Sequence, residues 1–205
     1  MLYRLTPSLV LRSPWRPYPA RPGEQVLTLR GSGVFPPGHP TTRLCLDLLQ
    51  EAMAAAPGER LLDLGCGSGV LALAGAALGA TLCVGVDLSR QSALISRDNA
   101  RKNGLGTAVL VVQGSTECLR GPFGLILANL PYEGQLEKVA ELSRLAPPPG
   151  LLILSGFRDT QEEELWRLYQ AEGWRRSRRL YRYEWPLELP PEKSFTWAAW
   201  LLKRP

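Results

Sequence analysis

Apolar runs alternate with amphipathic stretches along most of the chain, and this alternation predicts the fold. Runs of strand length occur near residues 60–64, 81–87, 108–113, 123–129 and 150–155. Stretches with helical spacing of apolar residues occur near 69–79, 89–104, 132–146 and 159–172. Strands that alternate with helices in this way form a parallel sheet with helices on both faces and right-handed connections.

The two ends of the chain have different patterns. Residues 1–40 are rich in proline and arginine, and one alternating run at 25–30 predicts a short strand. A helix is expected next, with Thr41 or Thr42 as its cap, and residues 174–205 predict two further strands joined by a proline-rich turn at 186–191. We therefore expect an extension over 1–40 that wraps the core, and one domain with a seven-stranded sheet over 41–205.

A glycine-rich turn follows the first of these strands, in the sequence LLDLGCGSGV from Leu61 to Val70. Glycines at 65, 67 and 69 let the backbone turn sharply and approach a ligand closely. Asp87 ends the next strand, 22 positions after Gly65, and this spacing suits an acid that accepts hydrogen bonds from ribose hydroxyls. A ligand-free strand-turn-helix is the alternative interpretation.

The turn differs from a dinucleotide fingerprint because Val70 stands where that pattern has glycine. With Asp63 before Gly65, Gly67 and Gly69, it resembles motif I of class I S-adenosylmethionine-dependent methyltransferases. The resemblance implies a Rossmann-like seven-stranded class I sheet, and it gives Asp63 the role of supporting the loop around the methionine part of the cofactor. S-adenosylmethionine has no phosphate, which agrees with the absence of Gly-Lys-Ser/Thr after the glycines.

A polar residue, Asn129, ends the nearly apolar strand at 125–128, where an amide needs a hydrogen-bond partner. The sequence Asn129-Leu130-Pro131-Tyr132 resembles the Asn/Asp-Pro-Pro-Tyr motif of enzymes that methylate planar amines or amides. In that motif the amide oxygen and a proline carbonyl hold the NH₂ group, and the aromatic ring stacks on it. The resemblance implies Asn129 and Tyr132 as catalytic candidates, whereas the simpler alternative makes Asn129 a helix N-cap.

Ordered motifs over about residues 25–175 resemble the catalytic domain of PrmA-type enzymes, which methylate lysine and N-terminal amines of a large-subunit ribosomal protein. The motifs are Gly38 to Leu46, Leu62 to Ala72, Arg97 to Gly104, Ala128 to Leu130 and Leu154 to Gly156. The resemblance implies cofactor contacts at Thr42, Gly65, Asp87 and Asn129.

Two departures bear on the substrate. That family has a separate N-terminal recognition domain, and it usually has an apolar or small residue where Pro131 and Tyr132 occur. These two residues could therefore signal a glutamine amide or an adenine amine as the acceptor.

Composition narrows the remaining choices. Net charge +5, from 24 basic and 19 acidic residues, permits an RNA or ribosomal partner without requiring one. Four widely spaced cysteines and a single histidine, His39, indicate neither a zinc site nor a disulfide framework. His39 is plausible as a general base in isolation, but a loop histidine explains it equally well. The run of cations and aromatic residues at 174–185 suits either an RNA surface or an ordinary strand.

Taken together, these patterns predict a cytoplasmic S-adenosylmethionine-dependent methyltransferase that acts on a protein nitrogen, with a ribosomal protein as the candidate substrate. No signal peptide, membrane span or metal site is expected. Two rivals stay open: an N6-adenine or glutamine-amide methyltransferase that uses residues 129–132, and a non-catalytic RNA-binding module on this fold.

Overall fold

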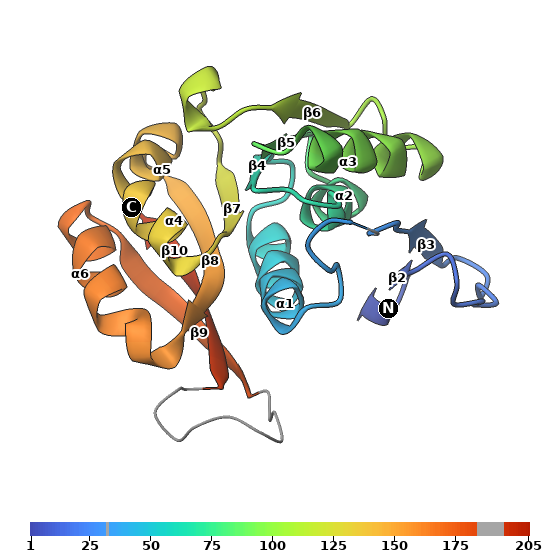
Figure 1. The fold of residues 1–205 in the computed structure, drawn as a ribbon, viewed down its shortest axis with the longest axis horizontal. Helices are drawn as coiled ribbons and strands as arrows, with labels where there is room; N and C mark the ends of the chain where they lie inside the picture. Colours follow the sequence, from blue (N-terminus) through green and yellow to red (C-terminus); the bar gives the residue numbers. More distant parts are fainter. Residues whose placement is uncertain (32, 184–194) are drawn as a thin grey trace.

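Seven strands form the main sheet in the computed structural model, which describes residues 1–31, 33–183 and 195–205 (Figure 1). Their order is β6-β5-β4-β7-β8-β10-β9. β4, β5, β6, β7 and β8 are parallel, and β10 is antiparallel to both β8 and β9. The strands are β4 (Arg60–Leu64), β5 (Leu82–Asp87), β6 (Val109–Gln113), β7 (Leu125–Asn129), β8 (Gly150–Arg158), β9 (Arg175–Tyr183) and β10 (Thr196–Arg204). The predicted α/β class and seven-stranded Rossmann-like sheet are confirmed.

Helices cover both faces of this sheet, because each helix buries one apolar side (Figure 1). One face carries α1 (Pro40–Ala55), α2 (Val70–Ala77) and α3 (Arg90–Lys102). The other face carries α4 (Tyr132–Glu137), α5 (Val139–Leu145) and α6 (Glu162–Ala171). Short 3₁₀ turns, η1 (Thr116–Cys118) and η2 (Asp159–Gln161), complete the connections.

Two helix predictions need correction. The single helix expected over 132–146 is broken at Lys138, which ends α4 and precedes α5. Apolar spacing did not reveal the break because Val139 and Leu142 keep the helical period. Thr41 and Thr42 do not cap α1: they lie inside it, and the Nδ1 atom of His39 accepts the N–H of Thr41 instead.

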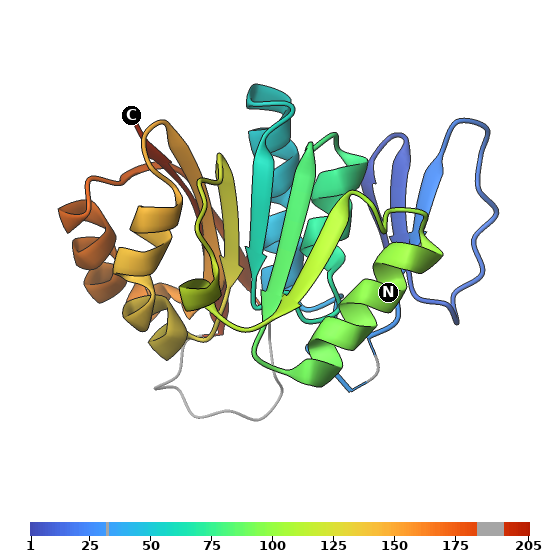
Figure 2. The same cartoon turned by 90° about the horizontal axis from the view of Figure 1, so that it is seen from above.

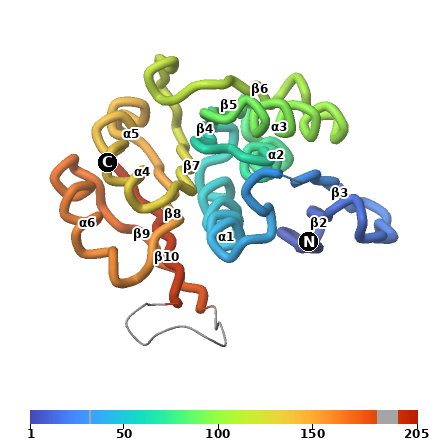
Figure 3. The backbone as a smooth tube through the Cα atoms, in the orientation of Figure 1, coloured from blue at the N-terminus to red at the C-terminus, as the bar shows by residue number. Residues whose placement is uncertain are grey.

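The extension contains more regular structure than its proline and arginine content indicated. β1 (Leu2–Thr6), β2 (Leu9–Arg12) and β3 (Gln25–Thr28) form a second sheet. Of these three strands, the sequence predicted only β3. Figure 2 shows this sheet at the end of the molecule opposite α6, and Figure 3 follows the chain from β3 past α2 into α1. Leu11, Leu27 and Leu29 are fully buried in one core with α1 and α2.

The remaining sequence features lie as follows. All four cysteine thiols are free. Within the described ranges no helix is long and apolar enough to cross a membrane. The two C-terminal strands are present as β9 and β10, and the proline-rich turn expected at 186–191 lies outside the described residues.

Candidate functional site

The glycine loop after β4 has two tightly packed glycines and one, Gly67, at which a Cβ atom would make only ordinary contacts. Gly65, Gly67 and Gly69 have φ values of +73°, +52° and +78°, a region that disfavours other residues. A Cβ atom at Gly65 would meet Leu130 at 2.5 Å, and one at Gly69 would meet Ser96 at 2.3 Å. A Cβ at Gly67 would meet nothing closer than Phe35, at 3.8 Å. Gly67 is therefore the glycine at which the backbone leaves room for a ligand.

Asp63, at the end of β4, holds the start of α2. Its buried carboxylate accepts the N–H of Ala72, the third residue of that helix, at 3.0 Å. Gly69 has no side chain with which to cap the helix, so Asp63 supplies the acceptor from a neighbouring strand. Burial raises the pKa of Asp63 to about 7, although the Ala72 hydrogen bond opposes this shift.

Asp87, at the end of β5, joins two backbone segments. Its carboxylate accepts the N–H of Gly67 at 2.9 Å and the N–H of Ser89 at 2.8 Å. Each carboxylate oxygen can accept a further hydrogen bond, and Asp87 is only partly buried. It therefore holds the glycine loop and still has lone pairs available to a ligand.

Two cavities meet at Asp87. The larger has a volume of about 420 Å³ and is lined by Gly67, Asp87 and Asn129 together with aromatic side chains. The smaller has a volume of about 270 Å³ and lies between Leu88, Ser115 and Lys138. Both are also lined by Gly65, Leu130 and Pro131. An elongated ligand in both cavities would pass Asp87 near its middle.

Asn129 has a buried amide oxygen without a hydrogen-bond partner in the described part of the chain. Its Nδ2 atom donates weakly to the hydroxyl of Thr42, at 3.4 Å. Because an unsatisfied buried acceptor costs about 1–3 kcal/mol, this oxygen favours a donor from a ligand. The helix-cap interpretation is wrong, since Pro131 precedes the first turn of α4.

The side chain of Tyr132 does not line the cavity that Asn129 lines. Its hydroxyl donates to Glu164 on α6 at 2.5 Å, and Tyr132 is absent from the residues that line the two cavities. Burial, followed by the contact with Glu164, raises the pKa of this phenol to about 12. The geometry gives no support to stacking of Tyr132 on an acceptor.

The other candidates fall into two groups. Thr42, Asp63, Gly65, Gly67 and Asn129 surround a small space of about 20 Å³ beside the larger cavity. Gly69 does not line these cavities, and a Cβ atom on it would meet Ser96 of α3 and Leu73 of α2.

Several residues of the site were missed. Phe35 and Trp197 flank the ring of His39, with centroids 4.8 Å and 5.1 Å away, and all three line the larger cavity. Gln135 ties α4 to the ends of β7 and β8 by donating to Ala128 and Ser155. These residues come from segments far apart in the sequence, and only a polar glutamine inside a helical apolar pattern offered a signal.

Within the basic and aromatic run at 174–185, Arg175–Tyr183 form β9, and most of the cations of this strand are paired. Arg178 and Arg182 bind Glu51 and Asp47 of α1, and Arg179 binds Glu162 of α6. Arg176 lies over the Trp166 ring, 4.2 Å from its centroid. The described part of this run therefore has the contacts of an ordinary strand.

Comparison with known proteins places this arrangement in a family. The model for ribosomal protein L11 methyltransferase (PrmA) matches residues 3–187. The chain belongs to this family. A ribosomal protein L11 methyltransferase of Syntrophotalea carbinolica is 39% identical over 174 residues, which cover 84% of this chain and 57% of the relative. The chain spans about half the length of the curated PrmA relatives it matches.

Solved structures agree with the fold of the PrmA family. A ribosomal protein L11 methylase of Lactobacillus delbrueckii subsp. bulgaricus matches with a TM-score of 0.82 at 24% identity, covering 99% of this chain and 98% of that one. A putative methyltransferase complexed with SAH matches with a TM-score of 0.63 at 14% identity, over 80% of this chain and 49% of that one. Within the described ranges no group of three or more His, Cys, Asp or Glu side chains could hold a metal ion.

Proposed function

We propose that this chain is an S-adenosylmethionine-dependent methyltransferase that transfers a methyl group to an amine of a protein. Membership of the PrmA family supports the reaction class. The observation that carries the proposal is the unpartnered amide oxygen of Asn129, which lines the larger of the two cavities that meet at Asp87. A ribosomal protein is the proposed substrate and the cytoplasm the proposed compartment, because the relatives are named for a ribosomal protein.

The residues present fit S-adenosylmethionine. Asp87 would hold the ribose hydroxyls, since its carboxylate keeps acceptor capacity beyond its two backbone bonds. The smaller cavity, with Leu88 on one side and Leu130 on the other, would receive the adenine. The larger cavity at Gly67 would receive the methionine part, where the site needs no phosphate cradle.

When bound, this cofactor supplies a methyl group on a sulfonium, whose thioether leaving group is already good. The work left to the chain is alignment of the acceptor and exclusion of water. Asn129 would accept an N–H from a neutral acceptor amine and so direct its lone pair, and Thr42 would hold the Asn129 amide in place. Phe35 and Trp197 would form an apolar wall around the acceptor.

The same geometry favours a flexible amine over a planar amide or adenine. A planar acceptor gains from a stacked aromatic ring, and Tyr132 is held by Glu164 outside the cavity. An alkyl amine needs only a narrow apolar channel and one acceptor, which Asn129 provides. The rival N6-adenine or glutamine-amide activity therefore rests on the Asn-Leu-Pro-Tyr sequence alone.

The test is transfer of a tritium-labelled methyl group from S-adenosylmethionine in a mixture of large-subunit ribosomal proteins and ribosomal RNA. We expect label in one protein band, with the label recovered as methylated lysine or N-terminal amine after hydrolysis. Label in RNA, or in glutamine, would establish the rival activity. If S-adenosylmethionine does not bind in calorimetry at all, a non-catalytic module replaces both proposals.

A further inference from the structure

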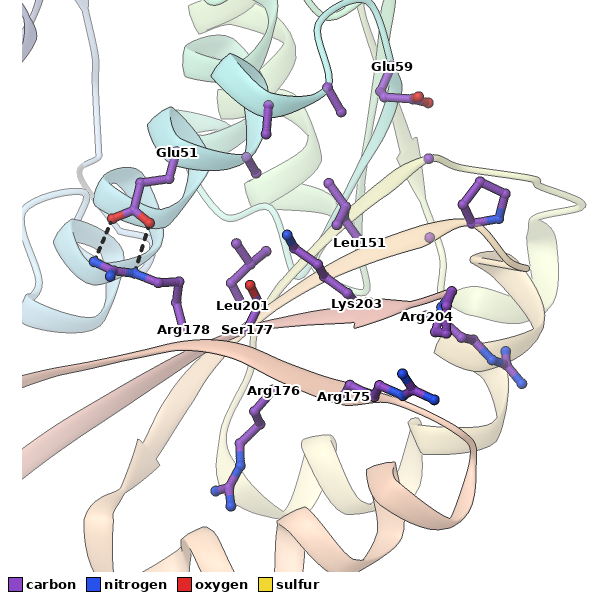
Figure 4. A pocket seen from close by; sticks show the side chains of 17 residues that line it. Glu51, Glu59, Leu151, Arg175, Arg176, Ser177, Arg178, Leu201, Lys203 and Arg204 are labelled. Atoms are coloured by element: carbon purple, nitrogen blue, oxygen red, sulfur yellow. Dashed lines mark hydrogen bonds and ion pairs between the residues drawn. The ribbon is translucent and has the colours of Figure 1, made fainter.

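A cavity of about 780 Å³ lies at the end of the sheet opposite the candidate site (Figure 4). It opens between the last turns of α1, the first residues of β8 and β9, and the end of β10. The candidate site gathers at the carboxyl ends of β4, β5 and β7, whereas this cavity adjoins residues that precede β4 and β7. The two are therefore separate, and the methyltransferase proposal makes no use of this cavity.

The floor of the cavity is apolar. The floor is lined by Ala52 and Ala55 of α1 and by Ala56, which follows that helix, together with Leu151 of β8 and Leu201 of β10. The side chains on the helix are small, so α1 leaves space above the sheet that larger residues would fill. Covering such a floor with apolar side chains of a partner is favourable, because it removes apolar surface from water.

Two cations at the edge of this floor have no acidic partner in the described ranges. Lys203 of β10 lies opposite Arg175 of β9 in the register of the two strands, and the charged ends of the two side chains point in different directions (Figure 4). Neither residue forms an ion pair with the described residues, whereas Arg178 beside them is paired with Glu51. Figure 4 shows Lys203 extending towards α1 into the cavity.

The other charges around the cavity do not neutralise this pair. Arg176 turns away to stack on Trp166, and Arg204 turns away to donate to the carbonyl of Ser143. Glu59 packs against Gly124, on the far side of the cavity. Arg175 and Lys203 therefore remain available to anionic groups of a partner.

We propose that this cavity is a docking site for an acidic segment of a partner protein. Apolar side chains of the segment cover Ala55 and Leu201, and carboxylates of the segment pair with Lys203 and with Arg175. RNA fits less well, because the lining residues that the structure describes include no aromatic side chain on which a base could stack. The site binds its partner independently of methyl transfer.

The probe is a fluorescein-labelled peptide of alternating leucine and glutamate, measured by fluorescence anisotropy with the full chain. Two control probes are measured in the same way: the same peptide with lysine in place of glutamate, and a labelled oligouridylate. We expect saturable binding of the acidic peptide alone. Preference for the oligouridylate would assign the surface to RNA and overturn the proposal, and so would the absence of saturable binding to the acidic peptide.

Matched variants locate the binding. Arg175→Glu should lower the affinity for the acidic peptide by about tenfold or more. Arg101→Glu, the same change at an exposed position of α3, should leave that affinity unchanged. Ala55→Trp should block the floor, whereas Ala54→Trp on the same turn of α1 should leave binding unchanged. Equal losses in variant and control would overturn the proposal, since both controls lie outside the cavity. Unchanged affinity for S-adenosylmethionine in calorimetry shows that each variant is folded.

Discussion

Asp87 holds the glycine loop and is also proposed to bind the ribose, and its substitution should affect both. Asp87→Ala should weaken the binding of S-adenosylmethionine by roughly 1.5–3 kcal/mol, the range for hydrogen bonds to a charged group. It should also loosen the glycine loop, because the N–H groups of Gly67 and Ser89 lose their acceptor. Isothermal calorimetry measures the affinity, with Asp98→Ala on the exposed side of α3 as the control. Unchanged affinity in a folded Asp87→Ala protein would remove this residue from the proposed ribose site.

Asp63 should make the protein less stable as the pH rises. Its pKa is about 7 in the folded protein and near 3.8 in an ordinary environment, so the folded state keeps a proton that the unfolded chain releases. The free energy of unfolding should therefore fall between about pH 4 and about pH 7, by at most about 1.4 kcal/mol per pH unit, and level off above.

The measurement is urea unfolding of the wild type and Asp63→Asn across this range. The uncharged amide keeps an acceptor for the N–H of Ala72 and cannot ionise. The stability of Asp63→Asn relative to the wild type should thus increase with pH. A constant difference would show that Asp63 has an ordinary pKa in the fold.

Asn129 and Tyr132 should respond differently to truncation. Asn129→Ala removes the free amide oxygen and should lower turnover about 10²-fold or more, with a smaller effect on cofactor affinity. Tyr132→Ala should retain substantial activity, because its ring lies outside the cavities and its hydroxyl binds Glu164. Both are measured by label transfer with Tyr132→Phe alongside. Activity lost in Tyr132→Ala but kept in Tyr132→Phe would point to a stacked planar acceptor.

At the scale of the elements, Gln135 illustrates how a helix positions a strand end. Its side chain is fully buried and donates to the carbonyls of Ala128 and Ser155, at 2.6 Å and 2.7 Å. Gln135→Leu leaves both carbonyls without this donor and should cost about 1–3 kcal/mol of unfolding free energy. Chemical denaturation measures the loss, with exposed Gln170→Leu as the control. Equal stability would mean that the two carbonyls find other partners.

The elements differ in how well the sequence predicts them. The buried parallel strands β4, β5, β7 and β8 are apolar runs, and the edge strand β6 is also an apolar run although most of it is not buried, which is why all five were located. β1 and β2 are short and lie among prolines and arginines, and the break at Lys138 leaves the apolar period intact. The residues of the candidate site also differ in whether the sequence predicts them. Gly65, Gly67 and Asp87 follow from local spacing, whereas Phe35 and Trp197 reach the cavity only through tertiary packing.

Two asparagines join the extension to the rest of the molecule: Asn99 of α3, and Asn103, which follows the last residue of that helix. Asn103 exchanges hydrogen bonds with the backbone of Thr28, and Asn99 does so with the backbone of Arg30. The pair therefore holds the extension as a neighbouring strand would. Asn99 is fully buried and also donates to the carbonyl of Ser68, at 2.8 Å, in the glycine loop. Asn99 thus connects the extension to the proposed cofactor site by hydrogen bonds, in addition to the direct contribution that Phe35 makes to the larger cavity.

This connection predicts a difference between two otherwise similar variants. Asn99→Ala should lower both the free energy of unfolding, by about 1–3 kcal/mol, and the affinity for S-adenosylmethionine, because the glycine loop loses a contact. Asn103→Ala should lower stability alone, since its side chain reaches only Thr28 and the helix itself. Denaturation and calorimetry on the same samples separate the two effects. An equal loss of affinity in both variants would mean that the extension acts on the site through its whole packing rather than through Asn99.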